Sequence, residues 1–232
     1  MPADLKKIYS DYWTTGQGPA RAAVESEIFE TVLSVLKPGG AFLDTGCGSG
    51  AFLKLAAPLF DLVRGTDISA PAVNAARANG FEAVEGDVSG TLPFADGSFD
   101  ACACLDVIEH VLDPLAALKE VRRVLKPGGQ LVLSTPNIRC FRHIARLIFS
   151  GEFPRTTEDD FLWGGGHLHY FTRKDILALL GAAGFTGAVF ALNPGQFGKS
   201  WKRKLARMAA GERLFGEFVE SSVIVACFKE KE

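Results

Sequence analysis

Short strand-like runs alternate with segments of helical period along most of the chain. In the helical segments apolar residues recur every three or four positions, as do Leu115, Leu118 and Val121. Runs of strand character are found at 41–45, 62–67, 82–85, 99–105 and 130–134, and later at 188–192 and 222–228. Strands that alternate with helices are typical of an α/β protein with a mostly parallel sheet.

Local signals predict where several helices begin and end. Asp113 is placed as an N-cap ahead of Pro114, and Thr172 with Asp175 is similar to a capping box for a helix that ends near Gly184. Further helices are expected at about 50–59 and after Pro71. The phrase Leu-Lys-Pro-Gly-Gly occurs at 36–40 and again at 125–129, and both copies predict a helix end followed by a turn into a strand.

Two segments lie outside this alternation. Residues 1–36 are expected to form a helical N-terminal lid, and residues 137–171 an insertion that caps the acceptor side. The insertion contains an amphipathic stretch at 141–149 with several arginines nearby. We expect residues 1–232 to form a single domain.

Composition narrows the class of protein. The chain has 232 residues, is 47% hydrophobic and carries a formal net charge of −2, which suits a globular core and gives no global basic charge for nucleic acid. The five cysteines lack metal-type spacing. The first residues contain no apolar signal core, and no run reaches the roughly 18 apolar residues of a membrane span. A reducing, cytoplasmic location is the simplest expectation.

A glycine-rich turn follows the strand at 41–45 and opens a helix. It contains Asp44, Gly46, Cys47, Gly48 and Gly50 in a G-x-G-x-G pattern. Glycine lets the backbone approach a ligand closely, but a dinucleotide-binding turn has the spacing G-x-G-x-x-G. A carboxylate at Asp44 would repel a pyrophosphate and attract an ammonium group.

Two more acids follow later strands in chain order. Asp67, with Ile68 after it, is placed to accept the hydroxyls of an adenosine ribose, with Ile68 against the adenine. Asp87, followed by Val88, is placed to accept from an adenine amino group. Each acid alone could instead serve a turn or an N-cap. Three acids in succession, each just past a strand, favour a nucleoside-type ligand.

These motifs resemble those of the class I S-adenosylmethionine-dependent methyltransferases over nearly the whole chain. The stretches 92–100 and 125–129 also match the family pattern. The resemblance implies a Rossmann-like three-layer sandwich with a seven-stranded sheet whose last strand is antiparallel. It implies S-adenosylmethionine as cofactor and S-adenosylhomocysteine as product, with Leu105 beside the methionine part. Cys47 fills a variable position of the motif and is expected to be a small packed residue.

All four histidines lie between the strand at 99–105 and the helix that starts near Thr172. His110 lies in a stretch similar to one of the ubiquinone-biosynthesis O-methyltransferases, where two acids and a histidine can hold a divalent cation. Here the first acid is the shorter Asp106, and no metal is expected. His110, His167 and His169 are the candidate catalytic residues. Their alternative is a structural part in a loop whose histidines bond to backbone carbonyls.

The chain is therefore expected to methylate a small molecule, most readily at oxygen; an N- or C-methyltransferase, or a cofactor-binding partner of a biosynthetic enzyme, is the alternative. The lack of a Tyr-x-x-x-Lys pair argues against an NAD-dependent oxidoreductase, and no motif indicates a nucleic-acid substrate. The basic stretch at 199–207 predicts a solvated helix or, together with 141–149, a weak contact with a membrane surface. The sequence does not specify an oligomeric state.

Overall fold

The computed structural model describes residues 3–15, 26–153, 166–192, 211 and 216–231. Before the sheet, the described residues include the helices α1 (Ala3–Thr14) and α3 (Ser26–Val35). The predicted helical character of the N-terminal segment is thus found in its described parts. The stretch 199–207 lies outside the described residues.

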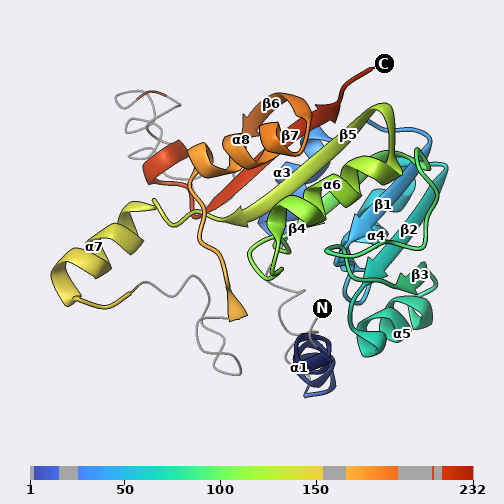
Figure 1. Ribbon diagram of the computed structural model, residues 1–232, viewed down its shortest axis with the longest axis horizontal. Coiled ribbons are helices and arrows are strands. Elements are labelled where there is room, and N and C mark those ends of the chain that lie inside the picture. Colours follow the sequence, from blue (N-terminus) through green and yellow to red (C-terminus); the bar gives the residue numbers. More distant parts are fainter. Residues whose placement is uncertain (1–2, 16–25, 154–165, 193–210, 212–215, 232) are drawn as a thin grey trace.

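One seven-stranded sheet forms the centre of the fold (Figure 1). Its strand order is β3-β2-β1-β4-β5-β7-β6, and β7 runs antiparallel to both of its neighbours, whereas the pairs from β3 to β5 are parallel. This confirms the predicted fold class, including the antiparallel last strand. The strands are β1 (Ala41–Thr45), β2 (Leu62–Asp67), β3 (Glu82–Glu85), β4 (Phe99–Leu105), β5 (Leu125–Pro136), β6 (Phe185–Ala191) and β7 (Ser222–Lys229).

Helices cover both faces of the sheet and make it the middle of three layers. Alternate residues of one strand enter opposite cores: Leu131 and Leu133 face the core formed with α6 and α8, and Val132 faces the core formed with α3, α4 and α5. Helices of the described ranges after β1 include α4 (Ala51–Ala56), continued by the 3-10 turn η1 (Ala57–Leu59), α5 (Ala70–Ala78), α6 (Pro114–Val124), α7 (Phe141–Ser150) and α8 (Arg173–Ala182).

The helix starts follow the predicted capping residues. The side chain of Asp113 accepts from the backbone N–H of Ala116, and Thr172 with Asp175 forms a complete capping box at α8. The start of β5 differs from the prediction, which placed it at residue 130. The strand begins at Leu125, directly after α6, because the buried Leu125 already pairs with Phe99 before the register shifts.

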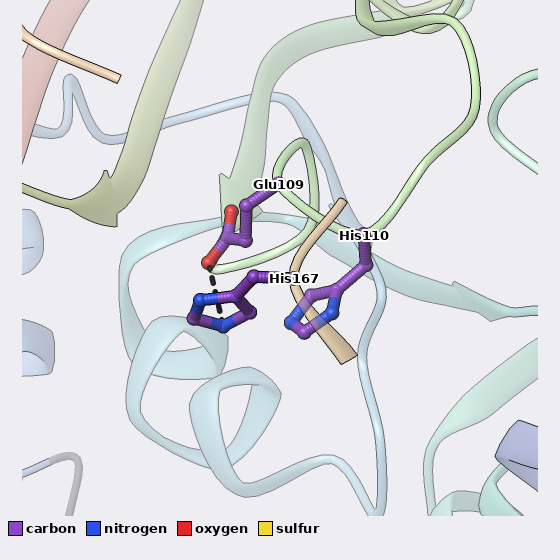
Figure 2. A group of neighbouring side chains, drawn as sticks. All are labelled: Glu109, His110 and His167. Atoms are coloured by element: carbon purple, nitrogen blue, oxygen red, sulfur yellow. Dashed lines mark ion pairs between the residues drawn. The ribbon is translucent and has the colours of Figure 1, made fainter. Parts of the chain in front are cut away.

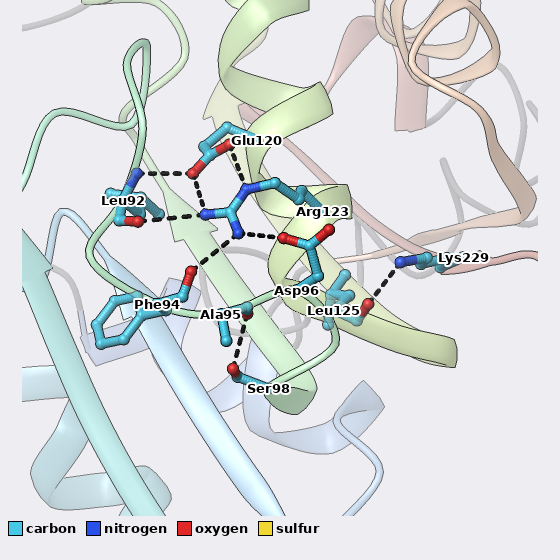
Figure 3. Close-up of polar contacts among 9 residues, drawn as sticks. All are labelled: Leu92, Phe94, Ala95, Asp96, Ser98, Glu120, Arg123, Leu125 and Lys229. Atoms are coloured by element: carbon cyan, nitrogen blue, oxygen red, sulfur yellow. Dashed lines mark hydrogen bonds and ion pairs between the residues drawn. The ribbon is translucent and has the colours of Figure 1, made fainter.

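Arg123 on α6 fixes the loop that leads into β4. Its guanidinium donates to the side chains of Glu120 and Asp96 and to the carbonyl oxygens of Leu92 and Phe94 (Figure 3). Glu120 in turn accepts the backbone N–H of Leu92 at 2.6 Å. The loop is thereby tied to a helix that is itself packed on the sheet.

The helix α7 extends away from the body of the molecule (Figure 1). None of its side chains is buried. No helix within the described ranges is both long and apolar enough to cross a membrane.

Candidate functional site

The glycine turn crosses the carboxyl edge of the sheet, between β1 and α4. Gly46, Gly48 and Gly50 all have positive φ angles, of 82°, 54° and 85°, which side-chain-bearing residues rarely adopt. The N–H groups of Gly46 and Cys47 both donate to the carbonyl oxygen of Thr66 at the end of β2, at 2.7 and 3.0 Å. The turn is therefore held against the neighbouring strand by its own backbone.

Neighbouring side chains occupy the space that a larger residue in this turn would need. A Cβ atom on Gly46 would lie 2.4 Å from Cγ2 of Val107, and one on Gly48 would lie 2.8 Å from the indole of Trp13. Trp13 belongs to α1, near the start of the chain. Val107 and Trp13 therefore pack closely against the backbone of the glycine turn, and a side chain at position 46 or 48 would displace them.

Asp67 ends β2 and its carboxylate bridges two backbone segments. Oδ2 accepts the N–H of Gly48 at 3.0 Å, and Oδ1 accepts the N–H of Ser69 at 2.9 Å. Burial raises the pKa of Asp67 even though these N–H groups favour the charged form. Ile68 next to it is half-buried. An acid held in this way can accept further donors, such as the two hydroxyls of a ribose.

The other predicted members of the cofactor site lie at the ends of adjacent strands. Asp44 is buried near the end of β1. Asp87 follows β3, where Oδ1 accepts the N–H of Ser89, while Val88 is buried and Leu105 half-buried. The backbone therefore brings all three acids to the same edge of the sheet. Asp87 also stabilises the turn after β3, which is the alternative role predicted for it.

The side chain of Cys47 points into the core. A Cβ atom on Gly65 of β2 would lie 2.6 Å from the Cys47 sulfur, and burial raises the pKa of this thiol. A ligand in the turn can therefore meet the backbone of Cys47. This geometry agrees with the expected small packed residue.

His110 lies beyond β4 on the acceptor side of the predicted site. Its Nδ1 lies 3.2 Å from the carbonyl oxygen of Gly166. Because a carbonyl oxygen only accepts, Nδ1 carries the proton in this pair, and in the neutral ring Nε2 carries the lone pair. The ring also makes an edge contact with Tyr9 of α1, at a centroid distance of 5.8 Å.

Glu109 joins His110 and His167 in one cluster (Figure 2). Oε1 of Glu109 lies 4.0 Å from Nε2 of His167, Oε2 accepts from the hydroxyl of Thr135, and the backbone oxygen accepts the N–H of Leu168. Both the Glu109 and the His167 side chains are almost fully buried. The sequence places Glu109 with Asp106 and His110 in a possible cation site but does not predict His167 beside them, because nothing in the local pattern indicates that residue 167 folds onto Glu109.

The spacing of this cluster would allow it to hold a metal ion. Glu109, His110 and His167 each offer one ligand atom, and these three atoms lie within 4.8 Å of one another. Asp106 is not one of these three residues, and its Oδ1 accepts from the hydroxyl of Ser134 at 2.9 Å. Asp106 is also the only non-glycine residue of the described ranges with a positive φ, at 50°. Such a backbone position at a strand end is common in functional sites.

The backbone N–H of His169 also donates to the backbone oxygen of Glu109, at 3.1 Å, but the imidazole of His169 is not part of the cluster. Its ring stacks on Phe171 at a centroid distance of 5.9 Å, and its buried Nε2 makes no hydrogen bond. The structure thus brings together two of the three candidate histidines, His110 and His167, whose ring centroids are 4.6 Å apart.

Comparison with protein families gives a match of residues 43–133 to a methyltransferase domain family. A curated relative, the ubiquinone biosynthesis O-methyltransferase of Xanthomonas axonopodis pv. citri, is 37% identical over 134 residues, which cover 54% of this chain and 56% of the relative. The chain therefore matches only about half the length of this relative.

Solved structures with a similar fold cover nearly the whole chain. A methyltransferase of Thermotoga maritima, described as S-adenosylmethionine-dependent and as a possible histamine N-methyltransferase, has a TM-score of 0.66 and 21% identity, with 97% of this chain and all of that chain covered. A chain from a complex of a Haloferax volcanii methyltransferase with its activator has a TM-score of 0.67 and 18% identity, covering 96% and 97%. At these identities the likeness establishes the fold.

Proposed function

We propose that this chain, whose residues 43–133 form a class I S-adenosylmethionine-dependent methyltransferase domain, transfers a methyl group from that cofactor to an oxygen atom of a small molecule. The observation that carries the proposal is the hydrogen bond from Gly48 to Asp67, which places the glycine turn beside a buried carboxylate at one edge of the sheet. The oxygen acceptor is supported by the name of the partly matched ubiquinone relative.

The residues at this edge fit the cofactor by their chemistry. Asp67 would accept the ribose hydroxyls, and Ile68 and Val88 would supply apolar surface for the adenine. Asp87 would accept from the adenine amino group, while Asp44 and the turn at 46–50 would hold the amino-acid tail. Leu105 would border the methionine part. When bound, the cofactor supplies a methyl group already activated on a sulfonium.

The protein must align the acceptor and remove its proton. With Nδ1 of His110 donating to Gly166, Nε2 can take the proton of an acceptor hydroxyl as the new oxygen–carbon bond forms and the carbon–sulfur bond breaks. His167 would line the same side, and Glu109 would hold it in place. We assign His169 a lesser part, since its ring packs on Phe171.

The test is a paired measurement of binding and transfer. S-adenosylhomocysteine should bind the wild-type protein in calorimetry, and the Asp67→Ala variant should bind much more weakly. Formation of S-adenosylhomocysteine should then appear with phenols or alcohols in an acceptor panel and not with amines. Binding without transfer to any acceptor, together with co-purification of one biosynthetic enzyme, would favour a non-catalytic partner. Transfer to amines or carbon acids only would indicate an N- or C-methyltransferase.

We further propose that α7 rests on an anionic membrane surface. Its large apolar side chains are exposed, with 86% of Phe149 and 67% of Ile148 open to solvent. At about 100° per residue, Arg142 and Arg146 lie on the far side of the helix from Ile148, whereas Phe149 lies next to Arg142, where the apolar and basic sides meet. A short helix with an apolar face and a basic face is typical of interfacial binding, because it combines apolar insertion with attraction to anionic headgroups. Such a surface would present apolar acceptors to the site.

Sedimentation with phosphatidylglycerol vesicles tests this contact. The wild-type protein should pellet with these vesicles at low salt and much less with phosphatidylcholine vesicles, and Phe149→Ser with Ile148→Ser should abolish pelleting. Val189→Ser is the matched control, because Val189 is 66% exposed on β6, far from α7 in the sequence. Equal retention of the α7 variant and the control would refute the proposal.

A further inference from the structure

The helix α1 is attached to the candidate site and not to either core. Among residues 6–15 no side chain is buried, and neither apolar core contains one of them. Figure 1 shows α1 beneath the carboxyl edge of the sheet, close to α5. A helix placed here contributes little to the apolar core, so its contacts with the site need another explanation.

Three contacts join α1 to three separate parts of the site. Lys6 forms an ion pair with Glu85, the last residue of β3 before Asp87. Trp13 lies against the glycine turn at Gly48. Tyr9 contacts the ring of His110 on the acceptor side. One face of α1 therefore spans the region from the adenine end of the proposed cofactor site to the proposed base.

The indole of Trp13 packs directly against Gly48. The edge atoms Cζ2 and Cη2 of the indole would lie 2.8 and 2.9 Å from a Cβ atom on Gly48, so only glycine leaves room for the ring. The N–H of the same Gly48 donates to Asp67. The indole thus borders the residue that links the glycine turn to the proposed ribose-binding acid.

We propose that α1 is the roof of the cofactor site and that Trp13 on it contacts the cofactor and favours its positively charged form. An aromatic ring attracts a cation through the negative potential of its face. S-adenosylmethionine carries a positive sulfonium, whereas the product S-adenosylhomocysteine is neutral at sulfur. Trp13 would therefore strengthen binding of the cofactor more than binding of the product, and so assist product release. This inference rests on the proposed function.

Calorimetry with both compounds tests the preference. Trp13→Leu keeps an apolar side chain but removes the aromatic face, so the ratio of S-adenosylhomocysteine Kd to S-adenosylmethionine Kd should fall about fivefold. Trp13→Phe should retain most of the ratio. Lys7→Ala is the matched control, because Lys7 is exposed on the same helix, and it should change neither affinity. If Trp13→Leu leaves both affinities within twofold, or weakens both equally, the inference is wrong.

Fluorescence gives a second readout that needs no acceptor. The chain has three tryptophans, so a Trp163→Phe, Trp201→Phe background leaves Trp13 as the reporter. Saturation with S-adenosylhomocysteine should reduce acrylamide quenching of this indole at least twofold, because the ligand would cover it. Unchanged quenching in a protein that binds the compound would show that Trp13 does not contact the ligand, while leaving the proposed function intact. Absence of binding to the wild-type protein would overturn both.

Discussion

The carboxylate of Asp67 accepts the backbone N–H of Gly48 at 3.0 Å, and this bond connects the ends of the first two strands of the sheet. One residue would bind the nucleoside of the proposed cofactor, and the other belongs to the turn beneath its tail. Loss of the acid is therefore expected to affect both halves of the cofactor site.

We expect Asp67→Asn to weaken S-adenosylhomocysteine binding by roughly 10- to 100-fold. Hydrogen bonds to a charged group contribute about 1.5–3 kcal/mol each, and the amide cannot accept from both Gly48 and Ser69 while also accepting ribose hydroxyls. Calorimetry measures the change. Retained affinity in a folded variant would show that Asp67 serves only the turn.

Asp67 also predicts the sign of two pH effects. Burial raises its folded-state pKa, so the folded protein binds the proton more tightly than the unfolded chain does. The contribution of Asp67 to the free energy of unfolding therefore falls as pH rises from the ordinary aspartate pKa through the raised one. Cofactor affinity should change in the opposite direction, increasing with pH as the carboxylate ionises. Chemical denaturation and calorimetry across this range, with Asp67→Asn as control, measure both slopes.

Gly46→Ala should destabilise the protein by about 1–3 kcal/mol and abolish cofactor binding, because the new methyl group would collide with Val107 at a positive φ. Gly39→Ala is the matched control. Its φ of 101° is also strained, but nothing lies within 4 Å of the new atom. If thermal denaturation gives the two variants the same loss, backbone strain alone explains the effect and crowding against Val107 does not.

Removal of the Arg123 guanidinium should destabilise the fold more than removal of an exposed one. Arg123→Gln should cost about 1.5–3 kcal/mol, since Glu120 is largely buried and would lose its charged partner. Arg64→Gln, which breaks an exposed pair with Glu82, should cost about 0–1 kcal/mol. Urea denaturation compares the variants, and equal midpoints would contradict this ranking.

His110→Gln should lower turnover about 100-fold or more while leaving S-adenosylhomocysteine affinity within about twofold, because His110 acts on the acceptor and not on the cofactor. His169→Gln should have a smaller effect on turnover. Removal of divalent cations with EDTA is expected to leave wild-type activity unchanged. Restoration of lost activity by an added divalent cation would instead assign Glu109, His110 and His167 to a metal site.

Much of the fold follows from local sequence signals. The strands at 41–45, 62–67, 82–85 and 99–105 have the predicted bounds, and Asp113 and Thr172 cap their helices as predicted. These features depend on residues within a few positions of one another, because a cap, a turn or a strand period is set by neighbouring backbone groups. The parallel order then places the acids that follow successive strands at one edge.

Only the tertiary structure decided which distant segments complete the site. Trp13 contacts Gly48, His167 lies beside Glu109, and the hydroxyl of Ser134 donates a hydrogen bond to the carboxylate of Asp106. Each pair joins residues far apart in the chain. The first two contacts depend on how a helix or an insertion packs at the sheet edge, and the third depends on the pairing of β4 with β5. No local periodicity carries that information, because the packing of side chains between separate elements determines it.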